Sequence, residues 1–145
     1  LVFIPLMYFT FISFSFNAMI LSQYQYNHSV AKTVINKLED LGFKQQDKIF
    51  FNGSLGYAPS VQNSAKKNPL LSFLYLEANF LGSQWYSKWF FEYLGFKARF
   101  HHIQNQKLLE LCKSEPVYVS QSYKIIHNED LFIVAFKGQC FNLSK

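Results

Sequence analysis

Residues 1–22 read LVFIPLMYFTFISFSFNAMILS and contain no charged side chain, and the first charged residue of the chain is Lys32. A helix of this length extends about 33 Å at 1.5 Å per residue, which covers the roughly 30 Å hydrocarbon core of a bilayer. We therefore expect residues 1–22 to cross a membrane as one helix, and the organisation of the chain follows from that segment.

A cleaved signal peptide is the alternative interpretation of the same segment. A signal peptide begins with methionine and a positive region and ends in a small-x-small cleavage site, and the apolar run shows none of these features. Because the initiator methionine is missing, we expect that sequence before Leu1 has been lost and that this is the last of several spans. A protein secreted after signal cleavage remains an open alternative.

The net charge and the two cysteines limit which partners and which cellular compartment are expected. The chain has 145 residues and a net charge of +5, with 14 Lys and Arg against 9 Asp and Glu. The basic residues are scattered, which argues against a nucleic-acid-binding protein. They suit anionic lipid headgroups, and an ordinary solvated surface is the alternative. Cys112 and Cys140 have no metal or redox spacing, so either a disulfide in an oxidising compartment or two free thiols is possible.

Residues 23–145 have room for one small domain with its own core. Apolar residues at helical spacing predict an amphipathic helix over residues 27–41, capped by Asn27 or Ser29 and ended by Gly42. A strand at residues 48–51 ends in the turn pair Asn52–Gly53. Further helices are expected near 60–67, at 84–94 after a Ser83 cap, and at 104–113, and further strands at 97–102, 117–119, 123–127 and 131–136.

Helices and strands alternate first and a hairpin closes the chain. The predicted fold is therefore α/β: one transmembrane helix followed by a small α/β sandwich domain with a partly parallel sheet and a C-terminal β-hairpin. The predicted domains are a transmembrane helix at residues 1–22 and an extracytoplasmic α/β domain at residues 23–145.

Two short segments are candidate phosphate sites. Gly53 and Ser54 follow a predicted strand, where the backbone amides of a tight loop can hold a phosphate, although a plain turn explains them as well. Lys66 and Lys67 are the only adjacent basic residues and could bind a phosphate or lipid carrier at a membrane surface. A solvated helix end is the alternative for the two lysines.

Trp85 and Trp89 lie four residues apart on one face of a helix that carries six aromatic residues. Core packing, contact with the membrane interface and stacking on a sugar ring are the three interpretations. His101 and His102, expected to point to opposite faces of a strand end, have no metal-ligand spacing, so neither a metal nor another cofactor is expected. The carboxylates contain no pair that nominates a catalytic acid or base.

Several landmarks occur in a familiar order. The apolar span is followed by AKTVI at 31–35, Asn52–Gly53, a loop with Pro59, AKKNPL at 65–70, the aromatic stretch Trp85–Gly95, and EPVY at 115–118 before the hairpin. Over most of residues 1–137 this order resembles the C-terminal part of bacterial Gtr-type O-antigen glucosyltransferases, which are multi-span membrane proteins.

The resemblance implies a C-type membrane glycosyltransferase that moves glucose from a polyprenyl-phosphate carrier to a polysaccharide acceptor. It implies a bacterial inner-membrane protein whose residues 23–145 face the periplasm, whose partners are membrane lipid, the lipid-linked donor and the polysaccharide, and which binds no nucleic acid. The catalytic carboxylates are expected in earlier spans, so this chain alone is expected to be inactive. The non-enzymatic alternative is a single-span membrane-anchored binding or assembly module.

Overall fold

The computed structural model describes residues 3–68, 81 and 83–142. The chain divides into two compact units, Leu1–Val30 with Tyr57–Asn79, and Ala31–Gly56 with Phe80–Lys145. Residues 1–2 of the predicted span and Pro69 and Leu70 of the family landmarks lie outside the described residues. The boundary expected after residue 22 falls inside a helix, and part of the central loop region groups with the N-terminal segment.

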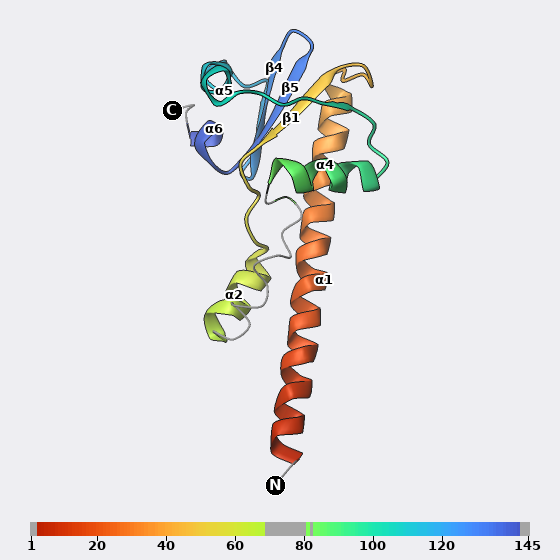
Figure 1. Ribbon diagram of the computed structural model, residues 1–145, viewed down its shortest axis with the longest axis vertical. Helices are drawn as coiled ribbons and strands as arrows, with labels where there is room; N and C mark the ends of the chain where they lie inside the picture. The colour runs from red at the N-terminus through yellow and green to blue at the C-terminus, as the bar shows by residue number, and fades with distance from the viewer. Residues whose placement is uncertain (1–2, 69–80, 82, 143–145) are drawn as a thin grey trace. The chain divides into compact units, whose positions relative to one another are not determined.

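The helix α1 (Phe3–Asp40) is one continuous element where the sequence predicts two (Figure 1). No glycine or proline occurs between Pro5 and Gly42, so nothing interrupts the backbone ladder. Asn27, predicted as a cap, lies inside the helix, where its Oδ1 accepts a 2.9 Å hydrogen bond from Gln23 Nε2. The predicted stop at Gly42 is confirmed: its φ is +82°, and the next amide, of Phe43, donates to Leu38 O.

The second unit contains a five-stranded mixed sheet. Its strands are β1 (Lys48–Asn52), β2 (Arg99–Phe100), β3 (Tyr118–Val119), β4 (Tyr123–Asn128) and β5 (Leu131–Phe136), in the order β2-β1-β5-β4-β3. β1 runs parallel to both of its neighbours, β2 and β5, whereas β4 runs antiparallel to β5 and β3. The predicted α/β fold with a partly parallel sheet and a closing hairpin is confirmed.

Alternate residues of β1 serve the two faces of the sheet. On one face the Phe51 ring lies 4.5 Å from that of Phe91 on α4 (Gln84–Tyr93) and stacks on Phe136 of β5. On the other face Phe50 belongs to a cluster with Leu108 of α5 (Asn105–Leu111). This alternation buries β1 on both sides, as expected for a central parallel strand.

The local signals that end and start helices explain most of the remaining boundaries. The Ser83 hydroxyl accepts a hydrogen bond from Tyr86 N, which confirms the predicted cap of α4. The helix expected near 60–67 is α2 (Pro59–Lys67), with proline in its first turn. The short helix α6 (Gln139–Asn142) was not predicted, because four residues are too few for a periodic signal.

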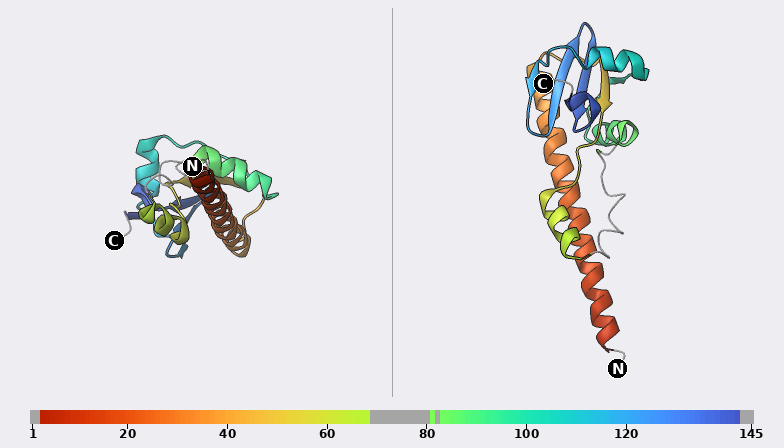
Figure 2. Two further views of the ribbon diagram at one scale, coloured as in Figure 1. Left: turned by 90° about the horizontal axis from the view of Figure 1, so that it is seen from below. Right: turned by 90° about the vertical axis from the view of Figure 1, so that its left-hand side faces the viewer.

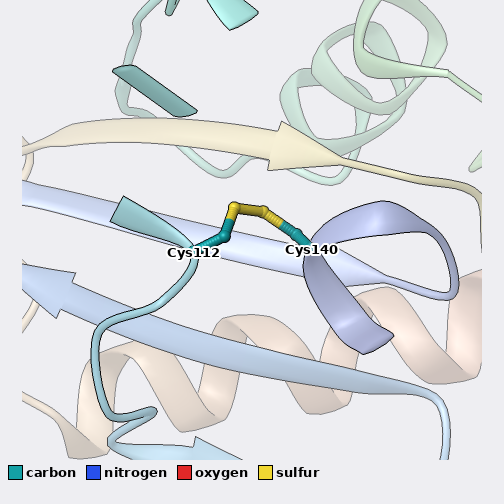
Figure 3. The surroundings of a disulfide bond; sticks show 2 residues. All are labelled: Cys112 and Cys140. Carbon is teal, nitrogen blue, oxygen red and sulfur yellow. A yellow bond between two sulfur atoms is a disulfide. The ribbon is translucent and has the colours of Figure 1, made fainter. Parts of the chain in front are cut away.

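Cys112 and Cys140 are joined by a disulfide bond (Figure 3). It links the end of α5 to α6, and both residues are buried in the cluster that contains Phe50. A cross-link of 28 residues removes loop entropy from the unfolded chain, typically about 3 kcal/mol of stabilisation. Of the two possibilities left open by the spacing, the structure has the disulfide.

Among the described glycines, Gly53 leaves the least room for a side chain. Its φ is +77°, and a Cβ at this position would lie 2.7 Å from the carbonyl oxygens of Phe136 and Lys137. The next amide, of Ser54, donates a 3.0 Å hydrogen bond to Lys137 O. Glycine at this position therefore allows the chain leaving β1 to pass against the end of β5.

We predict that Gly53→Ala costs about 3 kcal/mol or more of unfolding free energy, because backbone strain and steric overlap add. Gly56→Ala is the matched control: its φ is +78° but an added Cβ would meet nothing within 4 Å, so it should cost about 1 kcal/mol. Urea unfolding followed by tryptophan fluorescence measures both. Equal losses for the two variants would contradict the close contact.

Candidate functional site

Polar contacts fix α2 against the N-terminal half of α1. The buried Gln23 carboxamide oxygen accepts a 2.8 Å hydrogen bond from Ala58 N, at the start of α2. The hydroxyls of Ser22 and Ser60 lie 2.6 Å apart. From this end the two helices run antiparallel, side by side (Figure 1 and Figure 2). The buried hydrogen bond between Gln23 and Ala58 N and the Ser22–Ser60 contact determine which turn of α1 faces which turn of α2.

Small side chains let the two helices approach closely. Ala58, which caps α2, and Val61 and Ala65 within it pack against Ile12 and Met19 of α1. Such small-residue faces are typical of helices that pack within membranes. The rest of α2 is polar, with Gln62, Asn63, Lys66 and Lys67 exposed.

A groove of about 610 Å³ runs between α1 and α2. Its α1 wall is mainly apolar and includes Phe11, Phe14 and Ala18, whereas its α2 wall carries Ser60, Ser64, Lys67 and Asn68. Lys67 lines the groove, and the adjacent Lys66 does not. The structure therefore separates the two lysines that the sequence treats as one site, and it gives one of them an apolar neighbourhood suited to an amphiphile.

By length and composition, α1 could span a membrane, and among the described residues it is the one helix that meets this test. Exposed large apolar side chains are concentrated in its first part: Phe3, Ile4, Leu6, Met7, Tyr8, Phe9, Phe11 and Phe14. Such a continuous exposed apolar surface is uncommon on proteins that stay in water. The groove therefore adjoins the part of the helix best suited to lipid.

Gly53 and Ser54 belong to the other compact unit, where their backbone forms part of the turn after β1. The amides of Ser54 and Leu55 donate to the carbonyl oxygens of Lys137 and Leu81, and the amide of Gly56 lies 3.4 Å from the Ser54 hydroxyl. These amides stabilise the turn after β1. Their predicted role as a phosphate cradle stays a prediction, and the contacts described support the plain turn.

The aromatic residues of α4 divide between core and surface. Phe90 and Phe91 are buried, whereas Trp85 is 64% and Trp89 56% exposed. Core packing is therefore wrong for the two tryptophans. Their rings meet edge to face at 6.2 Å, and only Trp85 of the pair lines a cavity beside the sheet. Membrane contact and sugar stacking remain as predictions.

His101 and His102 follow β2 and line that same cavity together with Trp85. The sequence predicts that they point to opposite faces of a strand end, but β2 stops at Phe100, so strand alternation does not govern them. No group of three or more metal-ligating side chains occurs within the described part of the chain. Both histidines line the cavity, a role that the sequence did not indicate.

Lys124 is a buried amine that sequence reasoning missed. It is 1% exposed, and its Nζ has no hydrogen-bond partner among the described residues. Across the sheet it pairs with Ala135, which pairs with Asn52, whose buried Oδ1 is likewise without a partner among them. Burial lowers the pKa of the Lys124 amine.

Two other side chains titrate away from their usual range. Burial raises the pKa of Tyr123, and the neighbouring Tyr118 adds to this effect. A 2.7 Å hydrogen bond from Lys48 lowers the pKa of Asp130. Neither residue lines a cavity described above, so both shifts are attributed to packing and to the β4–β5 turn.

Comparison with protein-family models, curated proteins and solved structures finds no match for this chain.

We predict that Lys124→Met raises the unfolding free energy by about 1–3 kcal/mol at neutral pH, because an uncompensated buried amine is removed. In the folded protein the pKa of the Lys124 amine lies below the usual 10.5. Between that lowered pKa and pH 10.5 the unfolded chain binds more protons than the folded one, so the unfolding free energy of the wild type rises with pH. The difference in unfolding free energy between Lys124→Met and the wild type should therefore become smaller as the pH approaches 10.5. Urea unfolding at several pH values measures it, with exposed Lys107→Met as the control. A destabilised Lys124→Met would show that the amine has a stabilising partner.

Proposed function

We propose that this chain is the extracytoplasmic, membrane-anchored end of a glycosyltransferase that moves glucose from a polyprenyl-phosphate carrier to a surface polysaccharide. The observation that carries the proposal is the groove between α1 and α2, where Lys67 borders an apolar wall. A polyprenyl phosphate is an amphiphile that matches both parts of this groove. Its phosphate would pair with the Lys67 ammonium, and its hydrocarbon chain would contact the apolar wall.

The position of Lys67 along α1 bears on how the groove would meet a bilayer. It lines the groove opposite Phe11 and Phe14, in the middle of the apolar segment. A lysine at the centre of the hydrocarbon costs several kcal/mol, so intramembrane charges face water-filled cavities, protein or the interface. With residues 1–22 across the bilayer, we propose that Lys67 faces the groove and extends its side chain toward the headgroups, where a lipid phosphate is the anion at hand.

The disulfide between Cys112 and Cys140 supports an oxidising compartment for this part of the chain. Disulfides persist in oxidising compartments such as the periplasm and are rare in the cytosol. This supports the extracytoplasmic placement of the sheet-containing unit, and a bacterial inner-membrane protein with that unit in the periplasm is the form proposed here.

The transfer chemistry rests on the family resemblance. No Asp or Glu is among the described residues that line the α1–α2 groove, so a base for the acceptor hydroxyl has to come from elsewhere in the enzyme. The role proposed for this chain is to hold the lipid carrier, and the isolated chain is expected to transfer no sugar.

A second candidate function is a non-enzymatic docking module. The observation that favours it is the exposed aromatic surface of α4, formed by Trp85, Tyr86, Trp89 and Tyr93. Tryptophan and tyrosine are enriched at membrane interfaces and at protein interfaces. In this alternative Trp85 and Trp89 contribute equally to docking.

We predict that Lys67→Gln weakens binding of polyprenyl phosphate by about tenfold, the effect of losing one charge-assisted hydrogen bond. Lys66→Gln is the matched control: it removes the same charge from the adjacent position, which is exposed but does not line the groove. Binding is measured with the full chain in lipid nanodiscs by titration of a fluorescent polyprenyl phosphate, with the uncharged polyprenol alongside.

Wild-type protein should prefer the phosphate to the alcohol, and Lys67→Gln should lose that preference while Lys66→Gln keeps it. Equal losses in the two variants would indicate general attraction to an anionic surface. The same affinity for phosphate and alcohol would contradict the groove as a lipid-phosphate site.

A further inference from the structure

A second cavity, of about 410 Å³, lies in the sheet-containing unit between α4 and the end of β2. The rings of Trp85 and Phe100 line it together with the polar side chains of Gln84, Lys88, His101 and His102. Pockets for small ligands have volumes of about 300–1,000 Å³ and combine apolar walls with a few polar groups. This cavity has that size and that composition.

The polar side of the cavity is held in place by backbone hydrogen bonds. His101 N donates to Ile49 O at 2.8 Å, which ties the segment after β2 to β1. On its other side His101 O accepts a 3.0 Å hydrogen bond from Gln84 Nε2 of α4. Because β1 and α4 both hold the backbone of His101, part of the cost of ordering this segment for a ligand is already met in the folded chain.

Lys88 gives the cavity its positive charge. Its Nζ lies 5.7 Å from the centre of the Phe100 ring and 3.9 Å from Glu92 Oε1. The second distance is long for a hydrogen bond, and exposed pairs of this kind contribute little. No Asp or Glu is among the described lining residues, so Lys88 and the two histidines favour an anion.

We propose that this cavity binds an acidic saccharide. The exposed face of Trp85 stacks on the C–H face of one sugar ring, and Lys88 with the imidazoles of His101 and His102 binds its carboxylate. The location of the site and its preference for an anion follow from the residues of the cavity. The choice of a saccharide over other ring-shaped anions rests on the proposed function. The acceptor of the transfer would then be an acidic polysaccharide.

The chain offers a built-in probe and a matched control. Trp85 and Trp89 are its only two tryptophans, they lie one helical turn apart, and their exposures are similar, but only Trp85 lines the cavity. In a Trp89→Phe variant the remaining indole fluorescence comes from Trp85 alone. Binding in the cavity should change that emission directly.

The test titrates the full chain in detergent with a hexuronate oligosaccharide and with its carboxyl-reduced, neutral counterpart. We expect the acidic ligand to shift Trp85 emission in Trp89→Phe and to bind at least about tenfold more tightly than the neutral one. Calorimetry should show that Trp85→Ala abolishes binding and that Lys88→Gln removes the preference for the acidic ligand. Trp89→Phe should retain wild-type affinity.

Lys67→Gln, which impairs only the lipid groove, should bind the acidic saccharide normally, so failure of one site is distinguishable from failure of the other. Equal affinity for the acidic and neutral ligands, or no binding of the acidic one at millimolar concentration, would overturn the proposal. Tighter binding of uridine monophosphate than of the hexuronate would also overturn it, because the cavity would then be a nucleotide site. Equal losses in Trp85→Ala and Trp89→Phe would indicate a docking surface instead.

Discussion

Lys67 carries a charge beside the first part of α1, whose exposed surface is mainly apolar, and this pairing constrains where the molecule can meet a bilayer. The segment from Phe3 to Phe14 is suited to hydrocarbon, whereas the polar face of α2 is not. The hydrogen bond between Gln23 and Ala58 N and the small residues of α2 keep the two helices together. A phosphate at the headgroup level satisfies the ammonium and leaves the apolar wall to a lipid chain.

Much of the fold follows from local signals in the sequence. The apolar runs of β1, β4 and β5, the Ser83 cap and the left-handed Gly42 each act over a few residues, so they could be located without a structure. The continuity of α1 could not, because Asn27 is a plausible cap until its side chain is seen bonded to Gln23 inside the helix. The helical stabilisation here comes from tertiary burial, which composition does not reveal.

The candidate sites likewise divide into what the sequence could predict and what it could not. The sequence identified Lys66, Lys67, Trp85 and Trp89 as unusual, but it could not separate the members of each pair, because groove and cavity are formed by segments distant in sequence. His101 and His102 could not be assigned to the cavity from sequence, because its walls also include residues of β1 and α4. The burial of Lys124 could not be predicted from the sequence, because a lone lysine in a strand is usually exposed. The sheet register and the packing show that it is buried.

Occupancy of the α1–α2 groove by a lipid phosphate is the central claim, and site-directed photo-crosslinking tests it most directly. A benzophenone side chain would be placed at Ala18, which lines the groove, or at the adjacent, exposed Asn17, which does not. Both proteins would be irradiated in detergent with a small excess of polyprenyl phosphate and analysed by mass spectrometry. The groove predicts a polyprenyl-phosphate adduct at position 18 and little at 17. Equal labelling at both positions, or none at position 18, would contradict a lipid carrier bound between α1 and α2.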